Sequence, residues 1–504
     1  MKPKFLFVII FLSIYLFLNL IIAYYLNAPS LKILIHFIII QTINIGVAYN
    51  LTELILTILL ERRDLPKVDR LTKYPPVAIL YVTFNDVIYE LLENLKCQTY
   101  PNYDIYVLDD STDEKCKEII DDSNLNIIRR DNRRGFKAGA LNNWLSIKGN
   151  NYEYFSICDS DSYIKEDFLE KMVKYAEHDQ NNNIAIFQSR IWNWNKNNPF
   201  PRNMGSMLPF FDYINCRLIN SCEYVVSWGH NNLLRTGSIL SVGGFNEEFI
   251  AEDLVVGINL LSHGYKCKLV DIISYEMIPE NIQSYSIRQA RWARQNLELF
   301  KLDLKDIDFV TRLHIFMLTY NFFIWYFYFI GIIIVIFGYN SNLNIVNISY
   351  YSSNFSHITS GPFFIYIFYI LNFSVFRLPL ALKLGVSISQ YAKNLLLITA
   401  ISYMSMFDTI REQTKYLIGY KSSFIVTNKA FKNESLFDII KNFKAANIFI
   451  IIILAGLTKN PFALILNFIW LIPFIFSSII IYITQKKATN DGFISIICKK
   501  YNKR

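Results

Sequence analysis

Apolar residues concentrate at the two ends of this chain, on either side of a polar middle between about Glu61 and Leu313. Residues 5–26 form a near-continuous apolar run, and residues 33–60 form a second one. Because roughly 20 apolar residues span a bilayer core, residues 1–60 are predicted to be an N-terminal transmembrane hairpin. A secretory signal peptide is the alternative, but the first run is long and no small-residue cleavage site follows it.

The C-terminal region, residues 314–504, contains further apolar blocks at residues 314–337, 362–382, 446–457 and 461–483. Residues 386–407 carry Lys393 and several serines, which predicts a helix near 386–410 that lies at the membrane interface. Lys and Arg flank the hairpin and follow residue 383, whereas residues 339–361 contain neither. The positive-inside rule then predicts about six transmembrane helices, with both termini and the polar middle cytoplasmic. We therefore expect an integral protein of the cell membrane, with the lipid bilayer as a partner.

Composition agrees with this organisation, since 53% of the 504 residues are hydrophobic. The net charge of +8 is mostly explained by the flanking Lys and Arg, and no basic stripe interleaved with aromatics indicates a nucleic-acid partner. The seven cysteines are odd in number and lack zinc-site spacing, so reduced thiols are expected.

In the polar middle, short apolar runs alternate with amphipathic stretches. Residues 77–83, 105–108 and 154–158 are predicted strands, and the predicted helices start near Val87 and cover residues 113–120, 135–147 and 165–176. This alternation predicts a Rossmann-like α/β domain over residues 61–313, with a parallel sheet covered on both faces. In such sheets, ligands bind beyond the carboxyl ends of the strands.

Pairs of acidic residues stand at those predicted strand ends. Asp109 and Asp110 follow the second strand, and Asp159 and Asp161 follow the third, so we expect both pairs in one crevice. Alternation along the chain places Asp159 and Asp161 on the same side. Two carboxylates at that spacing suit a divalent cation that also holds a diphosphate, although a solvated turn would have the same pattern.

Further motifs surround this D-x-D. In chain order, they are "CQTYPNYDIYVLDDSTD" (97–113), "DNRRGFKAGALNN" (131–143), "WGHNNLLRTGSILSVGGFNEEFIAED" (228–253) and "RQARWARQ" (288–295). With them, residues 75–300 resemble the family 2 inverting glycosyltransferases of the GT-A fold. The resemblance is to the membrane-embedded branch, which includes cellulose synthase, glucan synthases and ceramide glucosyltransferase. It implies a nucleotide-sugar donor, expected to be UDP-linked, and Mg²⁺ or Mn²⁺ held by Asp159 and Asp161.

The resemblance also implies roles for residues that bind the donor. Those expected at the nucleoside are Thr83, Asn85, Asp86, Asp109 and Asp110, although the family often has Glu where Asp86 stands. Lys137 and Arg291 are expected at the diphosphate, where a lysine acts as a point charge and an arginine makes bidentate contacts.

At the acceptor side, Asp253 is the implied catalytic base, with Glu252 as the alternative. Ala251 replaces the threonine of the family's T-E-D motif. Trp292 offers a flat face for a sugar acceptor, in a helix near 285–300 expected at the membrane interface, and His230 is implied to shape the acceptor pocket. Arg288 stands where the family usually has Gln, as in the ceramide glucosyltransferase type.

The stretch "FIVTNK" (424–429) resembles the gating loop of cellulose synthase-like enzymes, which covers the bound nucleotide sugar. Within a gating-type loop at 421–432, Thr427 and Lys429 are therefore implied to contact the donor.

Three functions remain open from the sequence. One is processive synthesis and export of a polysaccharide, the second is transfer of a single sugar to a membrane lipid, and the third is an inactive nucleotide-binding scaffold. The sugar, its linkage, accessory subunits and the oligomeric state are not specified by these motifs.

Overall fold

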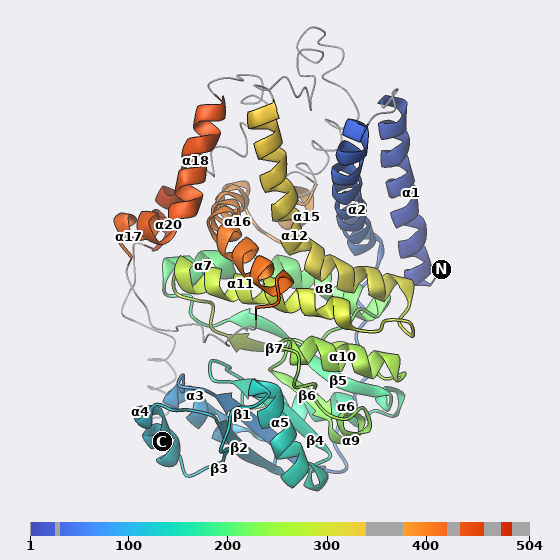
Figure 1. Cartoon of the computed structure of the whole chain (residues 1–504). Coiled ribbons are helices and arrows are strands. Elements are labelled where there is room, and N and C mark those ends of the chain that lie inside the picture. Colours follow the sequence, from blue (N-terminus) through green and yellow to red (C-terminus); the bar gives the residue numbers. More distant parts are fainter. Residues whose placement is uncertain (1, 26–30, 339–375, 421–433, 458–474, 486–504) are drawn as a thin grey trace.

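The computed structural model describes residues 2–25, 31–338, 376–420, 434–457 and 475–485. Within them, a seven-stranded sheet has the order β3-β2-β1-β4-β6-β5-β7 (Figure 1). The strands are β1 (Val77–Thr83), β2 (Tyr103–Asp109), β3 (Asn126–Arg129), β4 (Tyr154–Asp159), β5 (Ile184–Asn193), β6 (Asn232–Arg235) and β7 (Lys266–Glu276). The three predicted strands are therefore confirmed as β1, β2 and β4.

The sheet is mixed, so the prediction of an all-parallel sheet was wrong. β1 pairs in parallel with β2 and β4, and β5 pairs in parallel with β7. The short strand β6 lies between these two groups and runs antiparallel to both β4 and β5. The α/β class itself is confirmed.

Both faces of the sheet are covered by helices, as the alternation predicted. The helices of this domain are α3 (Tyr89–Asn94), α4 (Glu114–Asp121), α5 (Phe136–Ile147), α6 (Phe168–Ala176), α9 (Thr236–Ser241) and α10 (Glu252–Ser262). On one face, Leu80 and Phe155 pack with Trp144 of α5. On the other face, Ile79 packs with Phe168 of α6. Successive strand residues thus point to opposite cores.

A layer of helices separates the sheet from four long helices that run away from it side by side (Figure 1). The layer contains α7 (Pro199–Gly205), α8 (Leu208–Cys222), α11 (Ile282–Glu298) and α16 (Ile388–Leu417). The long helices are α1 (Pro3–Tyr25), α2 (Leu31–Leu59), α12 (Phe309–Gly338) and α18 (Lys444–Leu457). Short helices α15 (Leu378–Lys383), α17 (Leu436–Asn442) and α20 (Ser477–Gln485) complete the described part.

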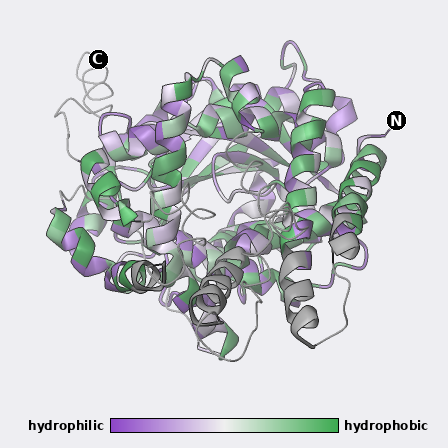
Figure 2. Cartoon of the chain, turned by 90° about the horizontal axis from the view of Figure 1, so that it is seen from above, coloured by the Kyte–Doolittle hydropathy of each residue, from purple (hydrophilic) through white to green (hydrophobic). Residues whose placement is uncertain are grey.

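In the described part of the chain, one helical stretch, Pro3–Leu20, is long and apolar enough to cross a membrane, and Ile43–Leu59 is a shorter apolar helix. Seen from above, α1 lies at the rim beside the N-terminus and carries mostly hydrophobic residues (Figure 2). The two helices predicted near 285–300 and 386–410 exist as α11 and α16. A bundle of six spans is not shown, and the predicted blocks at 362–382 and 461–483 lie mostly outside the described residues.

Candidate functional site

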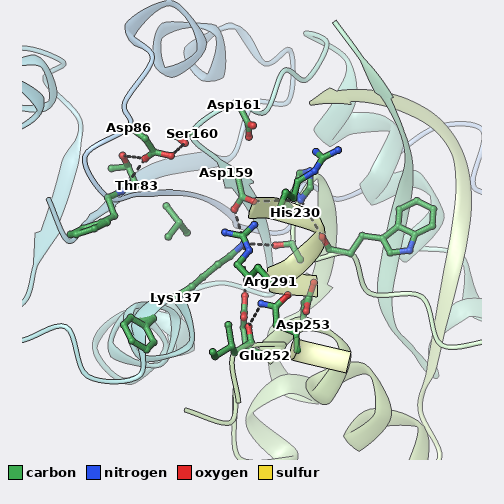
Figure 3. Close-up of a pocket in the computed structure, with 18 of the residues that line it drawn as sticks. Thr83, Asp86, Lys137, Asp159, Ser160, Asp161, His230, Glu252, Asp253 and Arg291 are labelled. Atoms are coloured by element: carbon green, nitrogen blue, oxygen red, sulfur yellow. Dashed lines mark hydrogen bonds and ion pairs between the residues drawn. The ribbon is translucent and has the colours of Figure 1, made fainter. Parts of the chain in front are cut away.

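A cleft of about 250 Å³ lies beyond the carboxyl ends of β1, β2, β4 and β7. The labelled side chains of β1, α5, β4, α10 and α11 converge on it (Figure 3). The predicted site residues that line it are Thr83, Asp86, Asp110, Lys137, Asp159, Asp161, His230, Glu252, Asp253, Arg288, Arg291 and Trp292. Asn85 and Asp109 are not among the lining residues. Thr427 and Lys429 lie outside the described residues, so their predicted roles stay predictions.

At the β1 end of the cleft, carboxylates are held in fixed positions. Asp86 accepts hydrogen bonds from Thr83 Oγ1 at 2.9 Å and from Ser160 Oγ at 2.6 Å. Asp110 accepts from Nε of Arg130 at 3.0 Å and from its Nη2 at 2.5 Å. These contacts leave each carboxylate oriented before any ligand arrives.

Planar groups lie beside these carboxylates. The guanidinium carbon of Arg133 is 3.2 Å from the centre of the Phe84 ring, and the Arg133 Nε is 3.7 Å from Asp110 Oδ2. Both residues line the cleft, and neither was predicted. A guanidinium stacked on a ring, with a carboxylate beside it, offers a nucleobase a planar surface for stacking and a hydrogen-bond acceptor.

Asn85 and Asp109 shape the loops around this end instead of facing it. Asn85 has a left-handed backbone, with φ of 57°, and its Oδ1 accepts from the backbone N–H groups of Thr112 and Asp113 at 2.8 and 2.9 Å. The Asp109 carboxylate has no exposed surface and pairs with Arg129 Nε at 2.7 Å. Both side chains fasten the turn that follows β2.

Lys137 joins three segments of the site. Its ammonium donates to Asp159 Oδ1 at 2.6 Å and to the Gly229 carbonyl at 3.0 Å, and lies 4.0 Å from Glu252 Oε1. Burial opposes the charge, but the carboxylates of Asp159, Glu252 and Asp253 together raise the pKa of Lys137. The lysine is therefore charged at neutral pH.

The D-x-D carboxylates fit a divalent cation that is shared with a substrate. Asp159 ends β4 and Asp161 follows in the turn, and both line the cleft. No cluster of three or more His, Cys, Asp or Glu with metal-site geometry occurs among the described residues. Mg²⁺ and Mn²⁺ commonly use one or two carboxylates and fill the remaining positions with phosphate oxygens and water. Two carboxylates are sufficient for that role.

Glu252 and Asp253 open helix α10, where the helix dipole favours negative charge. Asp253 Oδ1 accepts from the Leu254 N–H at 2.8 Å. Its other oxygen lies against Gly229, whose φ is 82° and where a Cβ would come within 2.8 Å of Asp253 Oδ2. A glycine is therefore required for this close approach.

The electrostatics of this pair keep both carboxyls more basic than usual. Burial raises the pKa of Asp253, with Lys137 opposing the rise. Burial and the neighbouring Asp253 charge raise the pKa of Glu252 well above its usual range. Carboxylates with raised pKa values are better proton acceptors, and they concentrate at active sites.

His230 connects the D-x-D to a second carboxylate. Its Nδ1 is 3.6 Å from Asp159 Oδ2, and its Nε2 is 3.3 Å from Glu276 Oε2. Although burial lowers it, the charges of Asp159 and Glu276 raise the pKa of His230 to about 9. Glu276 was not predicted, because it ends β7, a strand that was not recognised in the sequence pattern.

Helix α11 supplies the cationic and aromatic wall of the cleft. Arg288 Nη1 lies 3.9 Å from Glu276 Oε1, and its guanidinium carbon lies 4.8 Å from the Trp292 ring centre. Trp292 is 39% exposed at the mouth. Burial and the neighbouring Arg288 charge lower the pKa of Arg291, so an anion at this position would relieve an unfavourable environment.

Helix α16 and the turn that follows it contact α11 from outside the cleft. Ser286 donates to Asp408 Oδ2 at 2.6 Å, and Arg294 Nη2 donates to the Tyr420 carbonyl at 2.6 Å. These two contacts fix the wall formed by Arg288, Arg291 and Trp292 at both ends.

Comparison with known proteins agrees with this site. Residues 78–239 match the family model "Glycosyl transferase family 2". The chain is 27% identical over 277 residues to a protein named probable glucomannan 4-beta-mannosyltransferase 7 from Oryza sativa subsp. japonica, covering 50% of this chain and 46% of the relative. It is 26% identical over 277 residues to glucomannan 4-beta-mannosyltransferase 9 from Arabidopsis thaliana, covering 50% of each. The chain thus spans about half the length of the curated relatives it matches.

Among solved structures, the mannosyltransferase PcManGT from Pyrobaculum calidifontis in complex with GDP-Man and Mn²⁺ is similar, with a TM-score of 0.45 and 16% identity. That match covers 75% of this chain and 99% of the other. S. aureus TarS 1–349 in complex with UDP gives a TM-score of 0.32 at 14% identity, covering 71% and 97%. The match to glycosyl transferase family 2 thus covers residues 78–239, the part of the chain that contains β1 to β6 and the D-x-D.

Proposed function

We propose that this chain transfers a sugar from a nucleotide sugar to an acceptor hydroxyl with inversion, and that the product is a membrane-associated polysaccharide. The observation that carries the proposal is the convergence of the D-x-D, Lys137, the Glu252–Asp253 pair and Arg291 on one cleft. These residues are far apart along the chain, and each has the chemistry that one part of the reaction needs. An inactive scaffold would have no use for a carboxylate of raised pKa beside a diphosphate site.

Donor binding begins at the β1 end, where the nucleobase lies against Phe84 and Arg133 and near Asp110. Thr83 and Asp86 border the same pocket, while Asn85 and Asp109 hold the surrounding turns. Arg291 binds the diphosphate, and Lys137 keeps Asp159 and Glu252 in place beneath it. A Mg²⁺ or Mn²⁺ ion held by Asp159 and Asp161 would stabilise the charge that develops on the leaving diphosphate.

Asp253 is the proposed base. Inversion requires a carboxylate on the side of the sugar opposite the diphosphate, where it takes the proton from the acceptor hydroxyl as the oxygen attacks. Asp253 and Glu252 both line the cleft at the start of α10, but Asp253 is less buried, whereas Glu252 lies close to Lys137. His230, between Asp159 and Glu276, borders the acceptor side with Arg288 and Trp292.

The relatives' names favour a polysaccharide product over a single sugar on a lipid, because both are named glucomannan mannosyltransferases. They also make GDP-mannose a donor to test beside the UDP-sugars that the motifs predict. The membrane arrangement, with about six spans, a cytoplasmic site and a gating-type loop at 421–432, is part of the proposal.

The test uses the full chain in nanodiscs with Mn²⁺ and radiolabelled GDP-mannose or UDP-sugars. We expect one donor to be incorporated into high-mass product, and single-sugar lipid products would overturn the polysaccharide assignment. Asp253→Asn should abolish turnover while nucleotide binding, measured by calorimetry, is retained. The exposed Asp303 provides the matched control, Asp303→Asn, which should remain active. Turnover by Asp253→Asn would refute the base assignment, and failure of every donor would refute the function.

A further inference from the structure

The segment that leads into the proposed base is fastened to helix α11 by two hydrogen bonds. Helix α10 begins at Glu252, and Ile250 stands two residues before it. The Ile250 N–H donates to Glu298 Oε2 at 2.9 Å, and the Ile250 carbonyl accepts from Gln295 Nε2 at 3.1 Å. Gln295 and Glu298 are three residues apart on α11, which places them on one face of the helix. Two side chains thus hold both polar groups of a single backbone residue.

Glu298 acts only through the backbone of this segment. It is 7% exposed, and it is not among the residues that line the cleft. A buried carboxylate is unfavourable unless it accepts hydrogen bonds, and the Ile250 N–H supplies one of them. Gln295 is half-buried and lines the cleft. Of the two, Glu298 is therefore the side chain whose effect on a reaction cannot come from touching a substrate.

The Asp253 carboxylate has little freedom relative to its own backbone. Its Oδ1 accepts from the Leu254 N–H at 2.8 Å, and its Oδ2 lies against Gly229. The position of this carboxylate in the cleft is therefore set by where α10 begins. Helix α11, which holds Ile250, also carries Arg291, and the two helices line the cleft together (Figure 3). One helix thus fixes the proposed base relative to the proposed diphosphate site.

The other end of the same segment is held from the opposite side of the cleft. Asn142 Nδ2 donates to the Phe245 carbonyl at 2.8 Å, and Asn142 Oδ1 accepts from the Phe245 N–H at 2.9 Å. Asn142 belongs to α5, the helix that also carries Lys137. Residues 245–250 are therefore held between the helices of Lys137 and Arg291. Such support matters for a reacting group, because a misplacement of about 1 Å can reduce a rate about 100-fold.

We propose that Gln295 and Glu298 are positioning residues for the transfer step. By holding Ile250, they place Asp253 where it meets the acceptor hydroxyl on the side of the sugar opposite the diphosphate. Neither side chain takes up or gives a proton in this role. The role rests on the proposed function and deepens it, since it adds two residues of α11 that set the geometry of the base.

Two substitutions of Glu298 test the role in the full chain in nanodiscs. Glu298→Met removes the acceptor at similar volume, and Glu298→Gln keeps an acceptor oxygen for the Ile250 N–H. We expect the kcat of Glu298→Met to fall about 10- to 100-fold, with the KM for the donor and the calorimetric affinity for the nucleoside diphosphate unchanged. Glu298→Gln should recover most of the kcat. Rates are expressed per nucleotide-binding site, so unfolded protein does not contribute to the difference.

Asn296→Ala is the matched control for Gln295→Ala. The two amides are adjacent on α11 and each donates to one backbone carbonyl, but Asn296 Nδ2 donates to the Leu318 carbonyl at 3.0 Å, away from the base segment. Gln295→Ala should lower kcat about tenfold, and Asn296→Ala should leave it unchanged. A parent-like kcat in Glu298→Met, or equal losses in Gln295→Ala and Asn296→Ala, would overturn the proposal.

Hydrogen–deuterium exchange separates this role from the proposed function. Peptides that cover residues 246–254 should exchange faster in Glu298→Met than in the parent, and at the parent rate in Asn296→Ala. If the parent is active and Glu298→Met changes neither the exchange nor kcat, the positioning role is wrong and the proposed function stands. If the parent transfers no sugar from any donor, the proposed function fails, and the positioning role falls with it even where exchange shows that Glu298 holds the segment.

Discussion

Replacing Lys137 by methionine is the most informative single change in the cleft. The ammonium is the cation nearest to Asp159 and also faces Glu252. Methionine is similar in length and leaves no large cavity, so the change removes mainly charge. After this change, Asp159, Glu252 and Asp253 share a partly buried space without the cation that faces them, so the ionised form of each carboxyl group becomes less stable.

The expected loss of stability depends on how exposed the ion pair of Lys137 and Asp159 is. Breaking a buried ion pair by removing one partner costs about 3–5 kcal/mol, because an uncompensated charge is left behind. The side chain of Lys137 is 20% exposed and that of Asp159 is 35% exposed, so solvent screens part of this cost. We expect a loss of about 2–3 kcal/mol in the free energy of unfolding near pH 8.

The sign of the pH dependence follows from the raised pKa values. Because the pKa of Lys137 is raised, its contribution is present throughout the neutral range and is lost only at strongly alkaline pH. The carboxyls of Glu252 and Asp253 also have raised pKa values, so they become neutral as the pH falls. The destabilisation by Lys137→Met should therefore be smaller at pH 5.5 than at pH 8.5.

Chemical denaturation of the full chain in detergent, followed by circular dichroism at both pH values, measures this difference. Lys305→Met is the control, since Lys305 is 85% exposed and its removal should leave the stability nearly unchanged. Adding Asp159→Asn to Lys137→Met should recover about 1–2 kcal/mol of the loss. An equal loss at both pH values, with no recovery in the double variant, would refute the electrostatic reasoning.

Three further predictions concern residues outside the reacting groups. Burial lowers the pKa of Lys268 from 10.5 to about 8, which corresponds to a cost of about 3 kcal/mol for keeping the lysine charged in the folded state. Lys268→Met also loses one hydrogen bond, so it should raise the free energy of unfolding by about 2 kcal/mol at pH 7. The stability of the parent is expected to increase between pH 8 and about 10.5, and Lys268→Met should remove that increase. An unchanged melting profile would contradict this. Arg294→Ala loses the bond to the Tyr420 carbonyl and should cost about 2 kcal/mol, with Lys301→Ala as a near-neutral control in the same unfolding assay. Asn85→Ala loses three loop hydrogen bonds and strains a left-handed backbone, so it should cost about 2–3 kcal/mol, whereas Asn85→Asp keeps the acceptor and should cost less than half of that.

Strands with many consecutive buried apolar residues could be predicted from the sequence, whereas short or antiparallel strands could not. The seven residues of β1 are almost wholly buried and apolar, which gives a strong signal. The four-residue strands β3 and β6 contain only two apolar residues each. Nothing in such a short stretch shows direction, so the antiparallel course of β6 became visible only in three dimensions.

The candidate site shows the same division. Asp159, Asp161 and Asp253 belong to motifs whose order along the chain predicts their roles, and the structure brings all three to one cleft. For adjacent residues, however, the sequence could not say which one faces the cleft. Side chains alternate at a strand end, so Asp110 lines the cleft while Asp109 turns to Arg129. Asn85 and Asp86 also differ, because Asn85 stands in a left-handed turn and accepts from the loop after β2, while Asp86 lines the cleft.

The number of charged side chains that line the cleft explains why so many of them form ion pairs with one another. Its lining contains seven carboxylates, at positions 86, 110, 159, 161, 252, 253 and 276, against four permanent cations, Arg133, Lys137, Arg288 and Arg291. With His230 protonated and Glu252 neutral, one negative charge remains among these lining residues, and Arg130, which pairs with Asp110, balances it. A nucleotide diphosphate would add negative charge to a cleft whose cations are already balanced by carboxylates. A divalent cation held by Asp159 and Asp161 and shared with the diphosphate would offset that added charge.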